Sequence, residues 1–320
     1  MNRRKLLTLG AGALGAWSLA GGRPARAATL AERLGHGPET RLLMIHADDI
    51  GMCHSVNAAS QRALTEGIVS SGSIMVPCPW FPAIAAWSKA HPEACLGLHL
   101  TLTSEWQHYR WRPVTPPDRV PGLLDPDGFL WRRVEDVAKH ARAEEVEREI
   151  RAQIDRALAF GLKPTHVDSH MGTLFSRPDF FEAYVKVAAE TRLMPMLPGP
   201  TPEILLEARQ LGIDYGKMVE RLQAGGFVIL DRLVTSLTGS TYEARMTEFE
   251  KLVRELKPGV TELIVHLAGN DEEIRHVTGN WEPRYNELRL CTDPAARKLL
   301  EREGVKRVSY RDLAPLWKPA

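Results

Sequence analysis

The sequence lacks the features that mark several large classes of protein. Its 41 Lys and Arg residues are balanced by 40 Asp and Glu residues, and no basic run is interleaved with aromatic residues. A net charge of +1 creates no field directed toward nucleic acid, so we expect no nucleic-acid partner. No P-loop is present, and no G-x-G-x-x-G segment follows a predicted strand and opens a helix, so nothing supports a nucleotide site.

A convincing membrane span is also missing. The apolar stretch from Leu6 to Ala20 is too short and too rich in Gly and Ala to span a bilayer. It follows Arg3-Arg4 and precedes Ala25-Arg26-Ala27, an A-x-A pattern that signal peptidases cleave. We predict that residues 1–27 are a signal peptide of the twin-arginine type, which would make the protein periplasmic without stable membrane insertion. An uncleaved amino-terminal anchor is the alternative.

Cysteine is scarce and shows no C-x-x-C spacing. The sequence contains Cys53, Cys78, Cys95 and Cys291. An exported protein can form disulfides, but the first three cysteines lie in or beside apolar segments expected in the core. We therefore expect buried free thiols.

Short apolar runs alternate with amphipathic helical periods along the rest of the chain. We expect strands at residues 42–49, 71–79, 95–103, 164–170, 193–197, 227–233, 261–269 and 306–313. About seven strand and helix units with short links predict an α/β fold whose parallel strands form a closed or nearly closed (β/α) barrel. A chain of 320 residues can hold one such barrel or two smaller domains, and we expect a single domain over 28–320.

One long segment, residues 104–134, has no clear period. It holds three tryptophans and five prolines, and loops of this length are usually functional or disordered. Its aromatic residues favour an ordered lid in which Trp106 and Trp111 face a ligand. A loop that packs its own tryptophans is the alternative.

Strand alternation directs histidines from three separate strands to the inside of the predicted barrel. In 95–103 the leucines share one face, and His99 lies on the other with small neighbours. In 164–170 the residues His166, Asp168 and His170 share a face, and His266 lies near the end of 261–269. The outward leucines are expected to pack on helices.

The first predicted strand ends in Asp48 and Asp49. Because the sites of parallel barrels lie at the carboxyl ends of the strands, these aspartates and the inward histidines can converge. A cluster of His and Asp from different strands indicates a divalent metal. Two imidazoles and one carboxylate would leave coordination positions open for water and substrate, as in catalytic sites.

Five segments resemble a known family. They are LLMIHADDIGMCHSVNAA, LGLHLTL, KPTHVDSH, ELIVHLAG and the tail RYNELRLCTDPAARKLLEREGVKRVSYRDL. Together they resemble the YdjC-like carbohydrate deacetylases, which include chitooligosaccharide deacetylases, over residues 41–313. The resemblance implies a distorted, TIM-like (β/α) barrel of the polysaccharide-deacetylase kind and a metal-dependent hydrolase that removes acetyl groups from N-acetylated sugars.

The resemblance also implies roles for individual residues. Asp48 corresponds to the catalytic base, and Asp49, His99 and His170 correspond to the metal ligands. His266 corresponds to a histidine proposed to protonate the leaving group. The cofactor is expected to be one divalent ion, either Mg²⁺ or Zn²⁺, since these ligand types suit Zn²⁺ while the family is often described with Mg²⁺.

Four positions depart from the family pattern. Met171 and Gly172 replace histidines that often follow the DSH motif, and Leu267 replaces a proline. His46 stands where the family often has Asn, on the same face as Asp48, so it would either line the pocket or fill the inside of the strand. These departures leave the identity of the sugar open.

The role of Asp168 and the class of reaction are also open from the sequence. Asp168 would either orient an imidazole or form a salt bridge or helix cap. The protein could instead be a hydrolase of another ester or phosphoester, although few basic residues lie near the strand ends, or an exported sugar-binding protein without activity. The oligomeric state, a homo-oligomer included, is undetermined.

Overall fold

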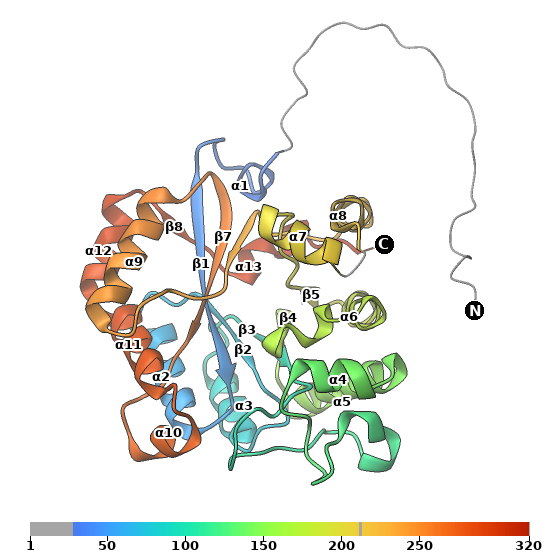
Figure 1. Ribbon diagram of the computed structural model, residues 1–320. Coiled ribbons are helices and arrows are strands. Elements are labelled where there is room, and N and C mark those ends of the chain that lie inside the picture. The colour runs from blue at the N-terminus through green and yellow to red at the C-terminus, as the bar shows by residue number, and fades with distance from the viewer. Residues whose placement is uncertain (1–27, 211–212, 320) are drawn as a thin grey trace, which may run out of the picture.

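The computed structural model describes residues 28–210 and 213–319 (Figure 1). The predicted signal peptide at residues 1–27 lies outside these residues, so the export signal stays a prediction. Within the described part of the chain, no helix combines the length and apolar character needed to cross a membrane.

The centre of the molecule is a curled, parallel sheet that follows the order β5-β4-β3-β2-β1-β7-β6, with β8 paired to β1. The strands are β1 (Arg41–Ile50), β2 (Ser71–Ile74), β3 (Leu96–Leu100), β4 (His166–Ser169), β5 (Met194–Pro195), β6 (Arg232–Val234), β7 (Gly259–His266) and β8 (Lys306–Arg307). The predicted α/β fold with about seven parallel strands is therefore confirmed.

Strand β1 organises the sheet. It pairs with β7 over most of its length, with β8 near its start and with β2 near its end. The register places Asp48 beside His266 of β7, and the β3–β4 register places His99 beside Asp168. Side chains predicted to act together are thus neighbours in the sheet.

The two edges of the sheet approach each other without forming a regular ladder. No strand pairing joins β5 to β6 among the described residues. The segments beside these strands meet through a backbone hydrogen bond, in which Leu230 N donates to Leu197 O over 2.9 Å. The barrel is therefore nearly closed, in agreement with the distorted barrel that the family resemblance implies.

Helices flank the sheet. They are α1 (Leu30–Arg33), α2 (His54–Thr65), α3 (Phe81–Ala90), α4 (Val134–His140), α5 (Ala143–Ala159), α6 (Pro178–Thr191), α7 (Pro202–Gln210), α8 (Tyr215–Ala224), α9 (Tyr242–Glu255), α10 (Glu272–Val277), α11 (Trp281–Thr292), α12 (Pro294–Arg302) and α13 (Tyr310–Leu313). Figure 1 shows α9, α11 and α12 grouped at one flank and α5 and α6 at the other.

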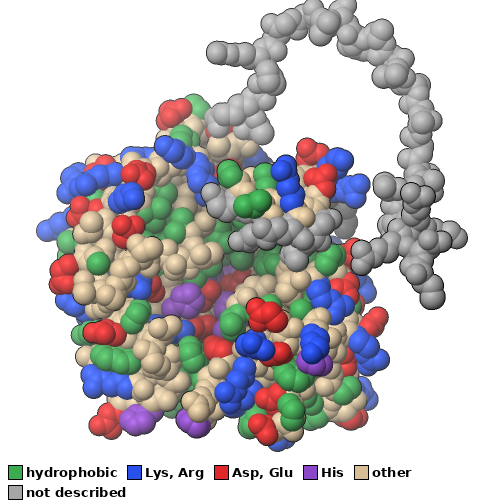
Figure 2. All heavy atoms as spheres, in the orientation of Figure 1, with side chains coloured by type: hydrophobic (Ala, Val, Ile, Leu, Met, Phe, Trp, Pro, Cys, Tyr) green, Lys and Arg blue, Asp and Glu red, His purple; other side chains and the backbone are tan. Residues whose placement is uncertain are grey.

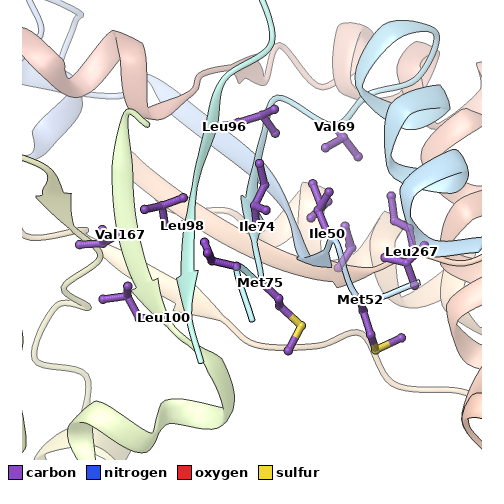
Figure 3. Packing of buried hydrophobic residues seen from close by; sticks show 14 of the residues in the cluster. Ile50, Met52, Val69, Ile74, Met75, Leu96, Leu98, Leu100, Val167 and Leu267 are labelled. Atoms are coloured by element: carbon purple, nitrogen blue, oxygen red, sulfur yellow. The ribbon is translucent and has the colours of Figure 1, made fainter. Parts of the chain in front are cut away.

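The main core lies between the sheet and these helices. Leu96, Leu98 and Leu100 of β3 belong to the same buried cluster as Ile150 and Ile154 of α5. Figure 3 shows the β3 leucines in a layer with residues of neighbouring strands. The predicted alternation, with leucines outside and His99 inside, is confirmed.

A second apolar cluster seals the amino-terminal end of the barrel. It contains Leu42 and Met44 from the start of β1 and Val260 from the start of β7. Leu30 of α1 and Leu313 of α13 pack against them. This end of the barrel is therefore filled with apolar side chains.

Several strands are shorter than predicted: β2 ends at Ile74 and not at residue 79, and β5 covers only Met194–Pro195 of 193–197. Residues 306–313 form a strand only at β8, because Ser309 and Asp312 make a capping box that starts α13. The strand expected at 227–233 begins only at Arg232, where β6 pairs with β7. The four cysteines are buried and free, as predicted.

Candidate active site

A cavity of about 970 Å³ opens at the carboxyl ends of the strands. Its polar wall contains six predicted site residues, Asp48, Asp49, His99, Trp106, His170 and His266. Its other wall is apolar and includes Phe181, Met196 and Leu233. Figure 2 shows histidine and acidic side chains gathered in a hollow of this face. A mostly apolar cavity with a few convergent polar groups is the usual form of a ligand site.

A local backbone irregularity brings both adjacent aspartates into the cavity. In a regular strand, neighbouring side chains point to opposite faces. Here Asp49 adopts φ 65° and the β1–β2 register shifts between Ala47 and Ile50. Asp tolerates this left-handed conformation better than most residues do, and such conformations cluster at functional sites. The alternation rule therefore fails at the position where the two carboxylates are needed together.

Asp49, His99 and His170 form a set of ligands that fits one metal ion. Asp49 Oδ1 lies 3.5 Å from His99 Nε2 and 3.4 Å from His170 Nδ1. Ligand atoms about 2.1 Å from a shared ion at tetrahedral angles would lie about 3.4 Å apart. Asp49 Oδ1 is buried and has no hydrogen-bond partner among the described residues, which a bound cation would supply.

A carboxylate holds the second ring nitrogen of each histidine. Asp168 Oδ1 lies 2.5 Å from His99 Nδ1, and Glu105 Oε2 lies 3.1 Å from His170 Nε2. Partners of this kind fix the tautomer and ring orientation of histidines that bind metals. Burial opposes protonation of His170, but Glu105 and Asp49 raise its pKa to about 10. Binding of a cation would therefore displace a proton from this site.

Arg284 of α11 holds the remaining ligand. Its Nη2 donates to Asp49 Oδ2 over 2.7 Å, and both side chains are buried. Burial alone would raise the pKa of Asp49, but the Arg284 guanidinium and His170 hold that pKa well below its usual value. Asp49 is therefore ionised, with Oδ2 occupied by Arg284 and Oδ1 directed at the two histidines.

Two other groups of side chains also lie within ligand distance of one another. They are His46 with His166 and Asp168, and Asp48 with His99 and Asp168. Asp168 already bonds His99 through Oδ1 and His46 through Oδ2. His46 and His166 are fully buried, away from the cavity. The set formed by Asp49, His99 and His170 is better suited, because it has a free carboxylate oxygen and lines the cavity.

Asp48 is anchored through one carboxylate oxygen. Ser73 Oγ donates to Asp48 Oδ1 over 3.2 Å, and His46 Nε2 lies 3.2 Å from the same oxygen. Asp48 Oδ2 lies 3.8 Å from His99 Nε2, on the side of the ligand set. His266, at the end of the neighbouring strand β7, lines the same cavity.

The surroundings of His46 and Asp168 define what each side chain does. His46 does not line the pocket: its ring is 0% exposed and lies between Asp48 and Asp168. Asp168 bonds the imidazoles of His46 and His99 and so orients them. Asp168 thus orients imidazoles through close pairs with two histidines, and among the described residues it caps no helix.

The long segment 104–134 is ordered and combines both predicted arrangements. It contains the short 3-10 helices η1 (Pro117–Arg119) and η2 (Pro121–Leu123). Trp106 lines the cavity, as expected. The expectation that Trp111 faces a ligand is wrong, because its indole is 2% exposed and donates to Thr103 O over 2.9 Å. Trp111 instead holds the loop against the core.

Sequence reasoning missed Glu105 and Arg284. Glu105 is the second residue of the segment 104–134, shortly after β3, where its proximity to the inward His99 was the available signal. Arg284 is the first residue of the tail segment that carried part of the family resemblance. Its contact with Asp49 spans 235 residues, which no local pattern reveals.

Comparison with known proteins agrees with this geometry. The family model described as YdjC-like protein matches residues 42–302. The chain is 30% identical over 277 residues to a carbohydrate deacetylase from Geobacillus stearothermophilus, covering 86% of this chain and 99% of the relative. It is 30% identical over 281 residues to a chitooligosaccharide deacetylase from Yersinia enterocolitica, covering 85% and 99%.

Two further matches differ in extent. A carbohydrate deacetylase from Thermus thermophilus is 40% identical over 188 residues, which cover 57% of this chain and 65% of that protein. A crystal structure from Enterococcus faecalis V583, named as a candidate cellobiose-phosphate cleavage protein, superposes with a TM-score of 0.72 at 23% identity. It covers 86% of this chain and 99% of its own, and supports the fold. The extent of the family match shows that this chain belongs to the YdjC-like family.

Proposed function

We propose that this protein is a metal-dependent carbohydrate deacetylase that hydrolyses the acetamide of an N-acetylated sugar. One observation carries the proposal: the free oxygen of Asp49 faces His99 and His170, with a second carboxylate, Asp48, beside them. The names of the relatives from Geobacillus stearothermophilus and Yersinia enterocolitica support the same reaction.

Asp49, His99 and His170 would hold one divalent ion. When bound, the ion supplies the Lewis acidity that polarises an acetyl carbonyl and makes a water molecule more acidic. The chain contributes a fixed ligand geometry, because Arg284, Asp168 and Glu105 each hold one ligand from behind. Mg²⁺ and Zn²⁺ are the candidate ions.

Asp48 is placed to act as the general base. Its Oδ1 is anchored, and its Oδ2 faces the ligand set and the cavity. In the proposed step, Asp48 takes a proton from the attacking water while the water oxygen bonds to the acetyl carbon. The carbonyl oxygen then carries the developing negative charge.

His266 is placed to complete the reaction. It lines the cavity beside Asp48, and its backbone N–H donates to Glu287 Oε2 over 2.6 Å. In the proposed second step, protonated His266 gives its proton to the sugar nitrogen as the C–N bond breaks. The products are acetate and an amino sugar, so the atoms of water and of the acetamide are all accounted for.

The amino-terminal pattern extends the proposal to location. We propose that residues 1–27 direct the folded enzyme out of the cytoplasm through the twin-arginine route and are removed after Ala27. Replacing Arg3 and Arg4 with Lys should leave the precursor in the cytoplasmic fraction. A mature protein that still appears outside would contradict this route.

The proposed activity can be tested with a panel of substrates. Protein loaded with Mg²⁺ or with Zn²⁺ is given N-acetylglucosamine oligomers, acetyl xylan and a generic phosphoester, and released acetate and phosphate are measured. We expect acetate from the N-acetylated oligomers. Absence of acetate from every acetylated sugar, with the metal bound, would rule out the deacetylase function, and phosphate release would favour a phosphoesterase.

A further inference from the structure

We propose that His46 is a positioning residue for the base Asp48, and that it also ties this base to Asp168, the carboxylate that orients the metal ligand His99. The inference rests on the proposed deacetylase function. His46 lies on β1 two residues before Asp48 and is fully buried. Its ring therefore acts through neighbouring side chains and not by contact with a substrate.

One ring nitrogen of His46 contacts two carboxylates. Nε2 lies 3.2 Å from Asp48 Oδ1 and 3.0 Å from Asp168 Oδ2. Ionised carboxylate oxygens can only accept hydrogen bonds, so this arrangement requires a proton on Nε2. His46 therefore donates this proton to Asp168 Oδ2, in a bond that the charge of the carboxylate strengthens. Nε2 also lies within ion-pair distance of Asp48 Oδ1, so its N–H attracts that carboxylate as well.

The contact fixes the rotation of the Asp48 carboxylate. His46 and Ser73 both reach Oδ1, so Oδ2 is the oxygen that remains on the side of the metal ligands. A base held in this way starts the reaction in its productive orientation. It therefore speeds the reaction more than a base that rotates freely. After loss of His46, Oδ1 would still accept the hydrogen bond from the Ser73 hydroxyl but would lose its contact with the imidazole.

A buried layer behind His46 holds its ring in place. His166 meets the His46 ring edge-on at 5.0 Å, and Tyr310 meets it edge-on at 5.8 Å. Tyr310 stacks on His166 at 3.8 Å and donates its hydroxyl to Glu262 Oε2 over 2.8 Å. Glu262 Oε1 lies 3.6 Å from His46 Nδ1. The helix α13 near the carboxyl terminus thus supports the site through Tyr310.

The two carboxylates held by His46 serve different parts of the site. Asp168 keeps its own bond from Oδ1 to His99 Nδ1 when His46 is removed. Metal binding should therefore persist in a variant without His46. The base, in contrast, loses a group that holds its Oδ1, so the defect should appear in turnover.

The test compares His46→Ala, His46→Gln and Ser71→Ala in the metal-loaded enzyme. We expect His46→Ala to lower kcat about 10- to 100-fold, with KM and bound metal unchanged. Gln can place an amide donor near the position of Nε2, so His46→Gln should recover most of the loss. Ser71 is a buried polar neighbour that pairs with His46 in the β1–β2 register, and Ser71→Ala should keep the wild-type kcat.

Tyr310→Phe is a second variant that tests the same inference if His46→Ala does not fold. It keeps the stacked ring and removes only the hydroxyl that donates to Glu262. We expect kcat to fall about 2- to 10-fold, the equivalent of one hydrogen bond, with KM and bound metal unchanged.

Two results would overturn the inference. One is an unchanged kcat in folded His46→Ala or, if that variant does not fold, in Tyr310→Phe. The other is a loss of kcat that follows the loss of metal in proportion. Failure of the proposed function looks different, because the wild-type enzyme itself would then release no acetate.

Discussion

The two ends of the barrel are built from the same strands but hold opposite kinds of side chain. At the amino-terminal end, Leu42 of β1 and Val260 of β7 join a sealed apolar cluster. At the carboxyl-terminal end, the same two strands present Asp48 and His266 to the cavity. The barrel thus separates stability from chemistry along the length of each strand.

Buried charges are tolerated at the carboxyl-terminal end because each has a partner. Each buried carboxylate of the site has a defined partner, such as Arg284 for Asp49 and the two histidines for Asp168. Charges in a protein interior persist only when they are paired or bind a metal. The apolar end needs no such partners, so changes at the two ends should have separable effects.

The largest effect is expected from His170→Ala, which removes a ligand at the carboxyl end. The variant should lose bound metal, and acetate release should fall to background. Elemental analysis of the purified protein measures the metal, with His276→Ala on the exposed face of α10 as a matched control. A variant that keeps a full equivalent of metal would show that His170 is not a ligand.

A change at the amino end should act on stability alone. Met44→Ala creates a cavity in the sealed cluster and should lower the free energy of unfolding by about 2–5 kcal/mol. The kcat of the folded protein should stay at the wild-type value. A fall in kcat without a loss of stability in denaturant unfolding would break the separation of the two ends.

Glu262 lies between the two ends and should make stability depend on pH. Burial raises its pKa from the ordinary 4.5 to about 7, so the folded protein binds this proton more tightly than the unfolded chain does. Its contribution is therefore present below about pH 4.5 and is lost as the pH rises to about 7, by on the order of 3 kcal/mol. The Glu262→Gln variant has no carboxyl at this position, so its unfolding free energy lacks this pH-dependent contribution. The difference in unfolding free energy between wild type and variant should fall over this range, and a flat difference would contradict the assignment.

A smaller effect is expected from a change to Glu105, which bonds the metal ligand His170. Glu105→Gln keeps the size of the side chain that bonds His170 but removes its charge. Metal affinity should fall about 10- to 100-fold, while a saturating metal concentration should restore turnover. Competition with a chelator measures the affinity. An unchanged affinity would show that Glu105 does not tune the ligand.

Sequence patterns predicted much of this arrangement for physical reasons that hold locally. Period-two alternation placed His99 and Asp168 inside the barrel because side chains of a regular strand must alternate. The carboxyl ends of parallel strands meet, so the site residues could be placed together despite long separations in sequence. The strand prediction at 306–313 failed because the capping box at Ser309 starts a helix.

Other features depend on structure that no local pattern contains. The left-handed backbone at Asp49 breaks the alternation on which the prediction relied. Arg284 reaches Asp49 from a helix far along the chain. The resemblance of the segments to a family supplied the roles of Asp48 and Asp49, which alternation alone would have placed on opposite faces.

The most direct test of the metal site compares Asp48→Asn with Asp49→Asn for bound metal and acetate release. We predict that Asp48→Asn keeps the metal and loses about 10²- to 10⁴-fold in kcat, because only the base is removed. Asp49→Asn should lose the metal, because its free oxygen is the ligand. If Asp48→Asn loses the metal while Asp49→Asn keeps it, the proposed division of roles between the two aspartates is wrong.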